Sequence, residues 1–222
     1  MAMREARFGY LLTGLVAYLV LGPIAHEIFG ARDGLIMMIA LSSILVIGIF
    51  SLQESRLLFG FGIFLAVTAT SLSIADFFIP GGELLKLAAM ADIFLFFAMG
   101  VALGLKHMFS EGEITLNRLY GGICIYIMLG LCWSIVYMYL IWLQPDAFSG
   151  AIFDTADNPL YWDMIYFSFV TLTTLGYGDI TPVDPIARAL VYTEAIAGQL
   201  YIAILIGTLV GNITGKHRRK SA

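Results

Sequence analysis

Hydrophobic residues along the chain group into six long runs, separated by short polar stretches. The runs cover residues 8–25, 34–53, 57–75, 84–105, 119–145 and 189–215. A helix needs roughly 20 apolar residues to cross the hydrocarbon core of a bilayer, and each run approaches or exceeds that length. The pattern therefore predicts an all-α membrane protein with six transmembrane helices.

A further apolar stretch between the fifth and sixth runs predicts a shorter helix, over residues 159–173. Asn158 offers a capping side chain and Pro159 suits the first helical position. At about 1.5 Å per residue this helix reaches roughly 20 Å, which is less than the thickness of the hydrocarbon core. The chain must therefore re-enter, and irregular backbone after the helix is tolerated only where it lines a water-filled path.

Composition agrees with this pattern and excludes several classes of function. Of the 222 residues, 60% are hydrophobic and 13% are charged, which excludes an ordinary soluble domain. The sequence contains no metal-ligand spacing, no phosphate-binding glycine loop and no nucleophile constellation. We therefore expect no enzyme activity, no cofactor and no nucleic-acid partner.

Basic residues predict the orientation, because Lys and Arg favour cytoplasmic loops. A cytoplasmic N-terminus places most of them inside: Arg4, Arg7, Arg56, Lys106, Arg118, Lys216, Arg218, Arg219 and Lys220. Only Arg32, Arg188 and Lys86 then fall outside. We expect a multi-pass protein of the cell membrane with both termini cytoplasmic. The basic tail, 216–222, is either a simple anchor or a contact for anionic lipids.

The short helix runs into a segment that reads Thr171-Leu-Thr-Thr-Leu-Gly-Tyr-Gly-Asp179. Consecutive backbone carbonyls of such a segment can replace the water around a dehydrated potassium ion, and glycine permits the backbone angles required. The segment resembles the filter motif of the potassium-channel family, Thr-x-x-Thr-x-Gly-Tyr-Gly-Asp. Leu175 is the one departure, since the family more often has Val or Ile there.

The resemblance implies how the site would work. Potassium, as transported ion, would bind the carbonyls of Thr174, Leu175, Gly176 and Tyr177 and the Thr174 hydroxyl, with Gly178 ending the run. Thr171, Tyr166, Phe167 and Asp179 would support this filter, with Tyr166 bonded to Asp179; generic packing is the alternative for the two aromatic residues. Since one loop supplies a quarter of a carbonyl ring, the family implies a homotetramer.

Three polar or small residues of the last run are candidates for gating or support. Gly198 matches the hinge glycine of the family's inner helix, and close helix packing is the other interpretation. Glu194 is an acid within the membrane, either modulatory behind the filter or a neutral or paired structural carboxyl. Gln199 faces either the cavity or a neighbouring helix.

The helix order predicts two domains. Residues 1–110 form a charge-poor, four-helix domain that resembles a voltage sensor, and residues 111–222 form the pore domain. The pore domain comprises an outer helix (118–144), a turret (145–158), the pore helix (159–173), the filter (174–178), an inner helix (186–215) and the tail (216–222). A voltage sensor needs Lys or Arg at every third position of its fourth helix. That helix carries only Lys86, Asp92 and Lys106, so steep voltage gating is not expected.

Several acids fall in the predicted outer mouth: Asp146, Asp154, Asp157, Asp163, Asp179 and Asp184. They either raise the local concentration of cations or belong to a solvated loop. The sequence as a whole predicts a small six-transmembrane channel that conducts potassium passively. A weakly selective cation channel of the same fold is the closest alternative. A proton-coupled cation transporter that uses Glu194 or Asp92 is a more distant one.

Overall fold

The computed structural model describes residues 7–29, 56–78, 82–109, 115–150 and 160–220, and the expected span 34–53 lies outside them. The chain divides into two compact units. The first comprises Met1–Ser110 with Thr115–Leu129, and the second comprises Glu111–Ile114 with Gly130–Ala222. The border therefore falls within a helix, whereas the sequence placed a domain border in the loop before it.

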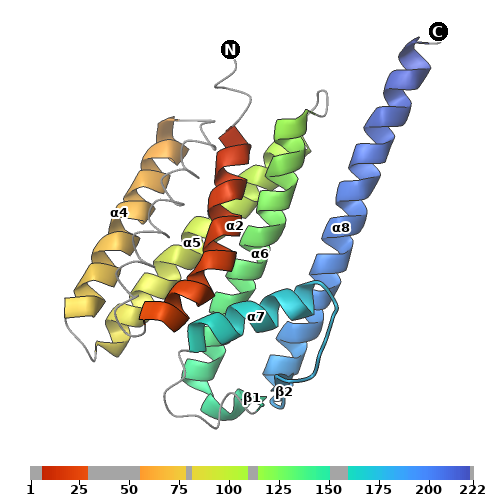
Figure 1. The fold of residues 1–222 in the computed structure, drawn as a ribbon. Helices are drawn as coiled ribbons and strands as arrows, with labels where there is room; N and C mark the ends of the chain where they lie inside the picture. The colour runs from red at the N-terminus through yellow and green to blue at the C-terminus, as the bar shows by residue number, and fades with distance from the viewer. Residues whose placement is uncertain (1–6, 30–55, 79–81, 110–114, 151–159, 221–222) are drawn as a thin grey trace. The chain divides into compact units, whose positions relative to one another are not determined.

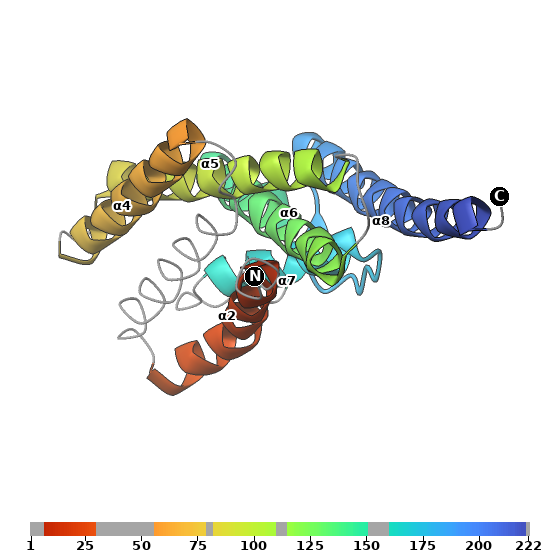
Figure 2. The same ribbon diagram turned by 90° about the horizontal axis from the view of Figure 1, so that it is seen from above.

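The first unit contains α2 (Arg7–Phe29), α4 (Arg56–Phe78), α5 (Glu83–Met108) and the N-terminal half of α6 (Leu116–Leu143). Helices α4 and α5 lie side by side in both views (Figures 1 and 2). Between them, the Thr68 hydroxyl donates a hydrogen bond to Asp92 Oδ2 over 2.6 Å. Asp92 therefore pairs with a neighbouring helix.

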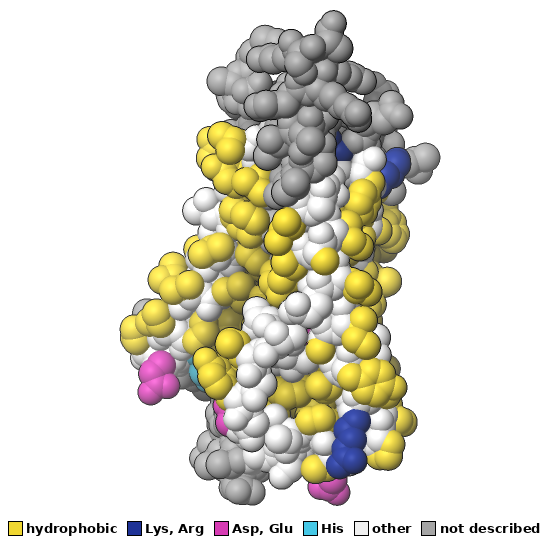
Figure 3. All heavy atoms as spheres, turned by 90° about the vertical axis from the view of Figure 1, so that its right-hand side faces the viewer, with side chains coloured by type: hydrophobic (Ala, Val, Ile, Leu, Met, Phe, Trp, Pro, Cys, Tyr) yellow, Lys and Arg dark blue, Asp and Glu magenta, His cyan; other side chains and the backbone are white. Residues whose placement is uncertain are grey.

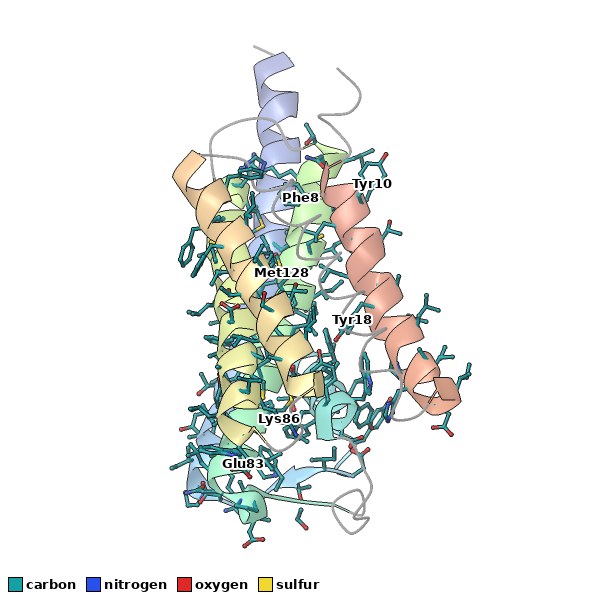
Figure 4. The ribbon with its side chains drawn as sticks, turned by 90° about the vertical axis from the view of Figure 1, so that its left-hand side faces the viewer. Phe8, Tyr10, Tyr18, Glu83, Lys86 and Met128 are labelled. Atoms are coloured by element: carbon teal, nitrogen blue, oxygen red, sulfur yellow. The ribbon has the colours of Figure 1, made fainter. Side chains whose placement is uncertain are left out.

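The start of α2 packs on α6. The Phe8 backbone N–H donates to Asn117 Oδ1 over 3.0 Å, so a side chain of α6 caps the first turn of α2. The Phe8 ring lies 3.5 Å from where a Cβ on Gly121 would be, and it is buried, whereas Tyr10 is 67% exposed. Figure 4 shows Phe8 pointing from α2 toward α6, and Tyr10 pointing away.

The second unit contains the rest of α6, a short 3-10 helix η2 (Pro145–Ala147), β1 (Phe148–Ser149), α7 (Leu160–Leu172), β2 (Thr181–Pro182) and α8 (Pro185–Lys220). Strands β1 and β2 are antiparallel, with Phe148 opposite Pro182 and Ser149 opposite Thr181. A side chain on Gly150 would collide with the Asp179 carbonyl, so two backbones approach closely here. The strand pair thus ties the end of α6 to the chain that follows the filter segment.

Within the described residues, four helical segments are long and apolar enough to cross a membrane: Phe8–Ile28, Glu83–Met108, Leu116–Leu143 and Pro185–Thr208. Helix α4 adds a shorter apolar stretch, Phe59–Leu72. The protein is therefore an all-α, multi-pass membrane protein, while the full set of six spans remains a prediction. The last helix continues through residues 216–220, which the sequence assigned to a separate tail.

The start of α8 assigns a local role to one of the acids expected at the outer mouth. Asp184 Oδ1 accepts hydrogen bonds from the N–H groups of Ile186, over 2.7 Å, and Ala187, over 3.2 Å. Pro185 follows as the first helical residue. Asp184 therefore satisfies two amides that the helix itself leaves unpaired. Two of the other acids, Asp154 and Asp157, lie outside the described residues.

Loss of this cap gives a first test. We expect Asp184→Ala to lower the free energy of unfolding by about 1 kcal/mol, because two N–H groups lose their acceptor. Thermal unfolding of the purified protein in detergent, followed by circular dichroism, measures the change. Asp146→Ala is the matched control, since it removes the same charge from η2. Equal losses in both variants would contradict the capping role.

Candidate ion-conduction site

The site begins where α7 ends. The Thr173 N–H donates to Phe169 O over 3.0 Å, and the Thr174 N–H donates to Thr171 O over 2.9 Å. The next two amides turn back to the same helix, because Leu175 N and Gly176 N lie 2.9 and 3.4 Å from Val170 O. The N–H groups of the loop thus face α7. This leaves the loop carbonyls free to face elsewhere.

Backbone angles in the loop alternate in a way that fits this arrangement. Thr174, Gly176 and Gly178 have φ values of 61°, 57° and 81°, in the left-handed region. Glycine adopts such angles readily, whereas Thr174 adopts its angle at an energetic cost. Within the described residues, the carbonyls of Leu175, Gly176 and Tyr177 accept no hydrogen bond. A run of unpaired acceptors in a membrane protein needs a partner, and a cation is one.

The loop is also open on the side away from α7. The side chains of Leu175 and Tyr177 are 58% and 67% exposed in the single chain. The C-terminus of α7 lies directly before the loop, and the C-terminal end of a helix carries partial negative charge. Both the helix and the carbonyls therefore favour a positive ion at this place.

The hydrogen bond expected between Tyr166 and Asp179 is present. The Tyr166 hydroxyl donates to Asp179 Oδ2 over 2.6 Å, and Asp179 Oδ1 accepts from the Ile180 N–H over 3.1 Å. The bond from Tyr166 lowers the pKa of Asp179 below its usual range. The same bond raises the pKa of Tyr166 to about 12. This pair links α7 to the backbone immediately after the filter segment.

The described ring neighbours of Phe167 lie on α6 and β1. Its ring is buried and packs edge-on against Tyr137, with centroids 5.2 Å apart, and against Phe148, 5.3 Å apart. Within the described residues no ring contact joins it to Tyr177. Phe167 therefore fixes α7 against α6 and β1, and any support of the filter by this residue is indirect.

Thr171 and Gln199 both lie next to Thr174. Thr171 is buried and its carbonyl accepts the N–H of Thr174, so it holds the turn that starts the loop. Gln199 is exposed, and its Nε2 lies 3.4 Å from Thr174 Oγ1. The sequence allowed Gln199 to face either the cavity or a neighbouring helix. In the structure its side chain is directed at Thr174, where the filter segment begins.

Gly198 lies where α8 crosses the end of α7. A side chain at this position would collide with the backbone carbonyl of Leu172 and come within 3.0 Å of Leu172 Cδ1. Helix α8 passes through Gly198 without a break. Close packing therefore has a defined contact, while a hinge at Gly198 stays a prediction.

Glu194, one turn before Gly198, is fully buried and lies among residues that the sequence did not single out. Its carboxyl oxygens contact the hydroxyls of Tyr137 on α6 and Ser168 on α7. These partners precede Glu194 by 57 and 26 positions in the sequence. Their polar groups within apolar helices were the only available signal, and that signal does not say which groups meet.

A half-length helix that ends in a loop of unpaired carbonyls, between two long apolar helices, is the architecture of a membrane channel. Residues 125–214 match the family model described as ion channel. The inward rectifier potassium channel Kirbac3.1 of Paramagnetospirillum magnetotacticum is 32% identical over 65 residues, which are 29% of this chain and 22% of the relative. A voltage-gated potassium channel of Aeropyrum pernix is 30% identical over 103 residues, 46% of this chain and 27% of the relative.

A plant protein gives a third match: two pore potassium channel c of Oryza sativa subsp. japonica is 39% identical over 51 residues, 23% of this chain and 11% of the relative. No solved structure matches the chain at a significant level. Over residues 125–214 the chain is therefore similar to the ion-channel family, and over stretches of 51 to 103 residues in length it is similar to potassium channels. It spans about a quarter or less of the length of these curated relatives.

The bond between Tyr166 and Asp179 predicts a dependence of stability on pH. Tyr166→Phe should lower the melting temperature at neutral pH, because the bond stabilises the carboxylate. A lowered pKa of Asp179 means that this difference disappears as the pH falls through that pKa. A raised pKa of Tyr166 means that it also disappears above about pH 12. The difference should be complete between the ordinary pKa values of Asp and Tyr, about 3.9 and 10.

Melting temperatures across this range in detergent measure the effect. Tyr192→Phe is the control, because Tyr192 is 60% exposed on α8. A Tyr166→Phe difference that persists at the same size below the pKa of Asp179 would contradict the assigned bond.

Close packing at Gly198 predicts that alanine substitutions at two glycines of α8 change the stability of the protein by different amounts. Gly198→Ala should destabilise the protein by about 1–3 kcal/mol, because backbone at the end of α7 must move. Gly207→Ala meets nothing within 4 Å in the described chain and should be neutral or stabilising. Thermal unfolding in detergent compares the two variants, and equal behaviour would rule out the packing role.

Proposed function

We propose that the protein is a potassium-selective channel, in which potassium passes down its gradient along the carbonyls of Thr174, Leu175, Gly176 and Tyr177. The observation that carries this proposal is the run of loop carbonyls that accept no hydrogen bond within the described residues, while the amides of Leu175 and Gly176 bind Val170 O. An ion that sheds its water needs several such oxygens at once. The relatives support the choice of ion, because their names describe potassium channels.

A closed ring of carbonyls requires more than one chain, and we propose a homotetramer. One loop provides a single strand of oxygens, and the chain contains no second filter segment. A row of exposed apolar side chains along α8 supports contact with other copies or with lipid (Figure 3). They are Ile186, Tyr192, Ile196, Leu200, Ile204 and Ile206. We also propose the cell membrane as the location, with cytoplasmic termini and lipid around the basic tail.

The channel should not be steeply gated by voltage. In α5, the expected fourth helix, two basic residues, Lys86 and Lys106, lie 20 positions apart with Asp92 between them. One elementary charge that crosses the field is worth about 2.3 kcal/mol per 100 mV, so a steep response needs several. Asp92 is held by Thr68, and this arrangement suits a fixed packing contact better than a charge that moves.

The described contacts also weigh against a proton-coupled transporter. Its two candidate proton carriers are Asp92, which binds Thr68, and Glu194, which binds Tyr137 and Ser168. Glu194 is fully buried, with no described path to water. A channel needs neither acid for transport, and this leaves both free for structural roles.

Reversal potentials in planar bilayers, with potassium on one side and sodium on the other, test the proposal. The reversal potential of the wild type should lie close to the equilibrium potential of potassium. Gly176→Ala and Tyr177→Val should reduce selectivity by about tenfold or more, because the first strains a left-handed angle and the second removes the ring of the filter tyrosine. Gly60→Ala in α4 is the control, since an added methyl meets nothing within 4 Å there.

Each outcome assigns a function. Wild-type current that reverses near zero would replace potassium selectivity with a general cation pathway of the same fold. Unchanged selectivity in both filter variants would show that residues 174–178 do not form the selectivity filter. Transport against the potassium gradient, driven by protons, would establish the transporter instead.

A further inference from the structure

Three fully buried polar side chains meet behind the filter segment, in the second unit. Glu194 on α8, Ser168 on α7 and Tyr137 on α6 are each at most 1% exposed. Glu194 Oε1 lies 2.5 Å from Ser168 Oγ, and Glu194 Oε2 contacts the Tyr137 hydroxyl. Ser168 Oγ lies in addition 2.7 Å from the carbonyl oxygen of Gly130 on α6. The cluster thus joins three helices through three oxygen–oxygen contacts.

Counting hydrogens constrains the state of this cluster. Two oxygens at hydrogen-bond distance need a hydrogen between them, so three contacts that share no hydrogen require three hydrogens. Tyr137 and Ser168 each carry one hydroxyl hydrogen, and the Gly130 carbonyl carries none. The third hydrogen has one remaining place, the carboxyl group of Glu194.

We propose that Glu194 is held as a neutral carboxylic acid and that it positions α7 beneath the filter. In this arrangement the acid donates from Oε1 to Ser168, Ser168 donates to Gly130 O, and Tyr137 donates to Glu194 Oε2. Every polar group is then satisfied and no charge is buried, which avoids a desolvation cost of several kcal/mol for an ion in an apolar interior.

The position of Ser168 connects the cluster to the filter. Ser168 lies two residues before Val170, and Val170 O accepts the amides of Leu175 and Gly176. A restraint on Ser168 is therefore a restraint on the carbonyl that orients the filter backbone. Glu194 touches no proposed potassium ligand, so it acts through α7 as a positioning residue.

Small residues bring the three helices close enough for these bonds. A Cβ on Gly130 would lie 2.8 Å from Phe169 Cζ, so α6 and α7 approach closely beside Ser168. Gly198 plays the same part between α8 and the end of α7. Both close approaches involve α7 within four residues of Ser168, and they limit how far α7 can shift.

The rival arrangement is a charged Glu194 whose neighbour Ser168 shares one hydrogen between Gly130 O and Glu194 Oε1. Infrared spectroscopy separates the two, because only the neutral arrangement contains a protonated carboxyl group. Substitution by Gln tests the positioning role, because an amide presents an NH₂ group to Ser168 and a carbonyl to Tyr137, which reproduces the donors and acceptors of a neutral acid. Ser168 accepts from this NH₂ group while it donates to Gly130 O, so the variant keeps every bond of the proposed cluster.

Infrared spectroscopy of the full-length protein in lipid membranes tests the protonation state without any need for conduction. We expect wild type minus Glu194→Gln to show the carbonyl band of a protonated carboxylic acid, shifted by deuterium oxide. Tyr137→Phe should move this band to higher frequency, because it removes the donor to Oε2. Asp92→Asn is the control and should leave the band in place. A carboxylate band in the difference spectrum would overturn the proposal.

Potassium flux into vesicles tests the positioning role, which rests on the proposed channel function. Glu194→Gln should retain wild-type flux and selectivity, whereas Glu194→Leu should lose about tenfold in flux. Loss in Glu194→Gln as large as in Glu194→Leu would overturn the positioning role of a neutral acid. Absence of flux in the wild type, with the acid band present, would instead refute the proposed function and leave the state of Glu194 established.

Discussion

Inside a bilayer, a backbone carbonyl or amide has no water to bind, and this constraint organises the whole molecule. Long helices satisfy it by bonding every peptide group to the next turn. The loop after α7 is the exception, because its amides bind Val170 O while its carbonyls have no partner within the described chain. Such a loop is stable only if something else satisfies those oxygens. A dehydrated cation can satisfy them, and this is the basis of the proposed function.

A loop with unpaired carbonyls needs support from its surroundings. The described contacts hold it from two sides. Tyr166 binds Asp179 beyond the loop, and Thr171 holds the turn before it. On the side of α7 away from the loop, rings and close backbone approaches pack the helix against α6 and α8. Stiffness of the surroundings matters because carbonyl oxygens that move freely lose their preference among cations.

Local signals in the sequence were sufficient for much of this arrangement. Five of the six expected spans coincide with described helices, and the pore helix expected at 159–173 is observed as Leu160–Leu172. The bond from Tyr166 to Asp179 was also predicted, because the resemblance to the potassium-channel family implies it. What the sequence could not provide is the pairing of distant groups. Tyr137, Ser168 and Glu194 meet only because three helices cross, and no local pattern encodes that crossing. For the same reason the sequence did not predict that Asp184 accepts two backbone amides at the start of α8.

The border between the compact units indicates where recombination between such chains would preserve the described contacts. It lies between Leu129 and Gly130, within one uninterrupted helix, and not at residue 110. The N-terminal half of α6 carries Asn117 and Gly121, which fit the start of α2, while the C-terminal half begins with the glycine whose carbonyl binds Ser168. Recombination at residue 110 would therefore separate α2 from the half of α6 that it contacts. A crossover in the middle of α6 keeps both sets of neighbours together, so the natural module of this chain begins and ends inside a helix.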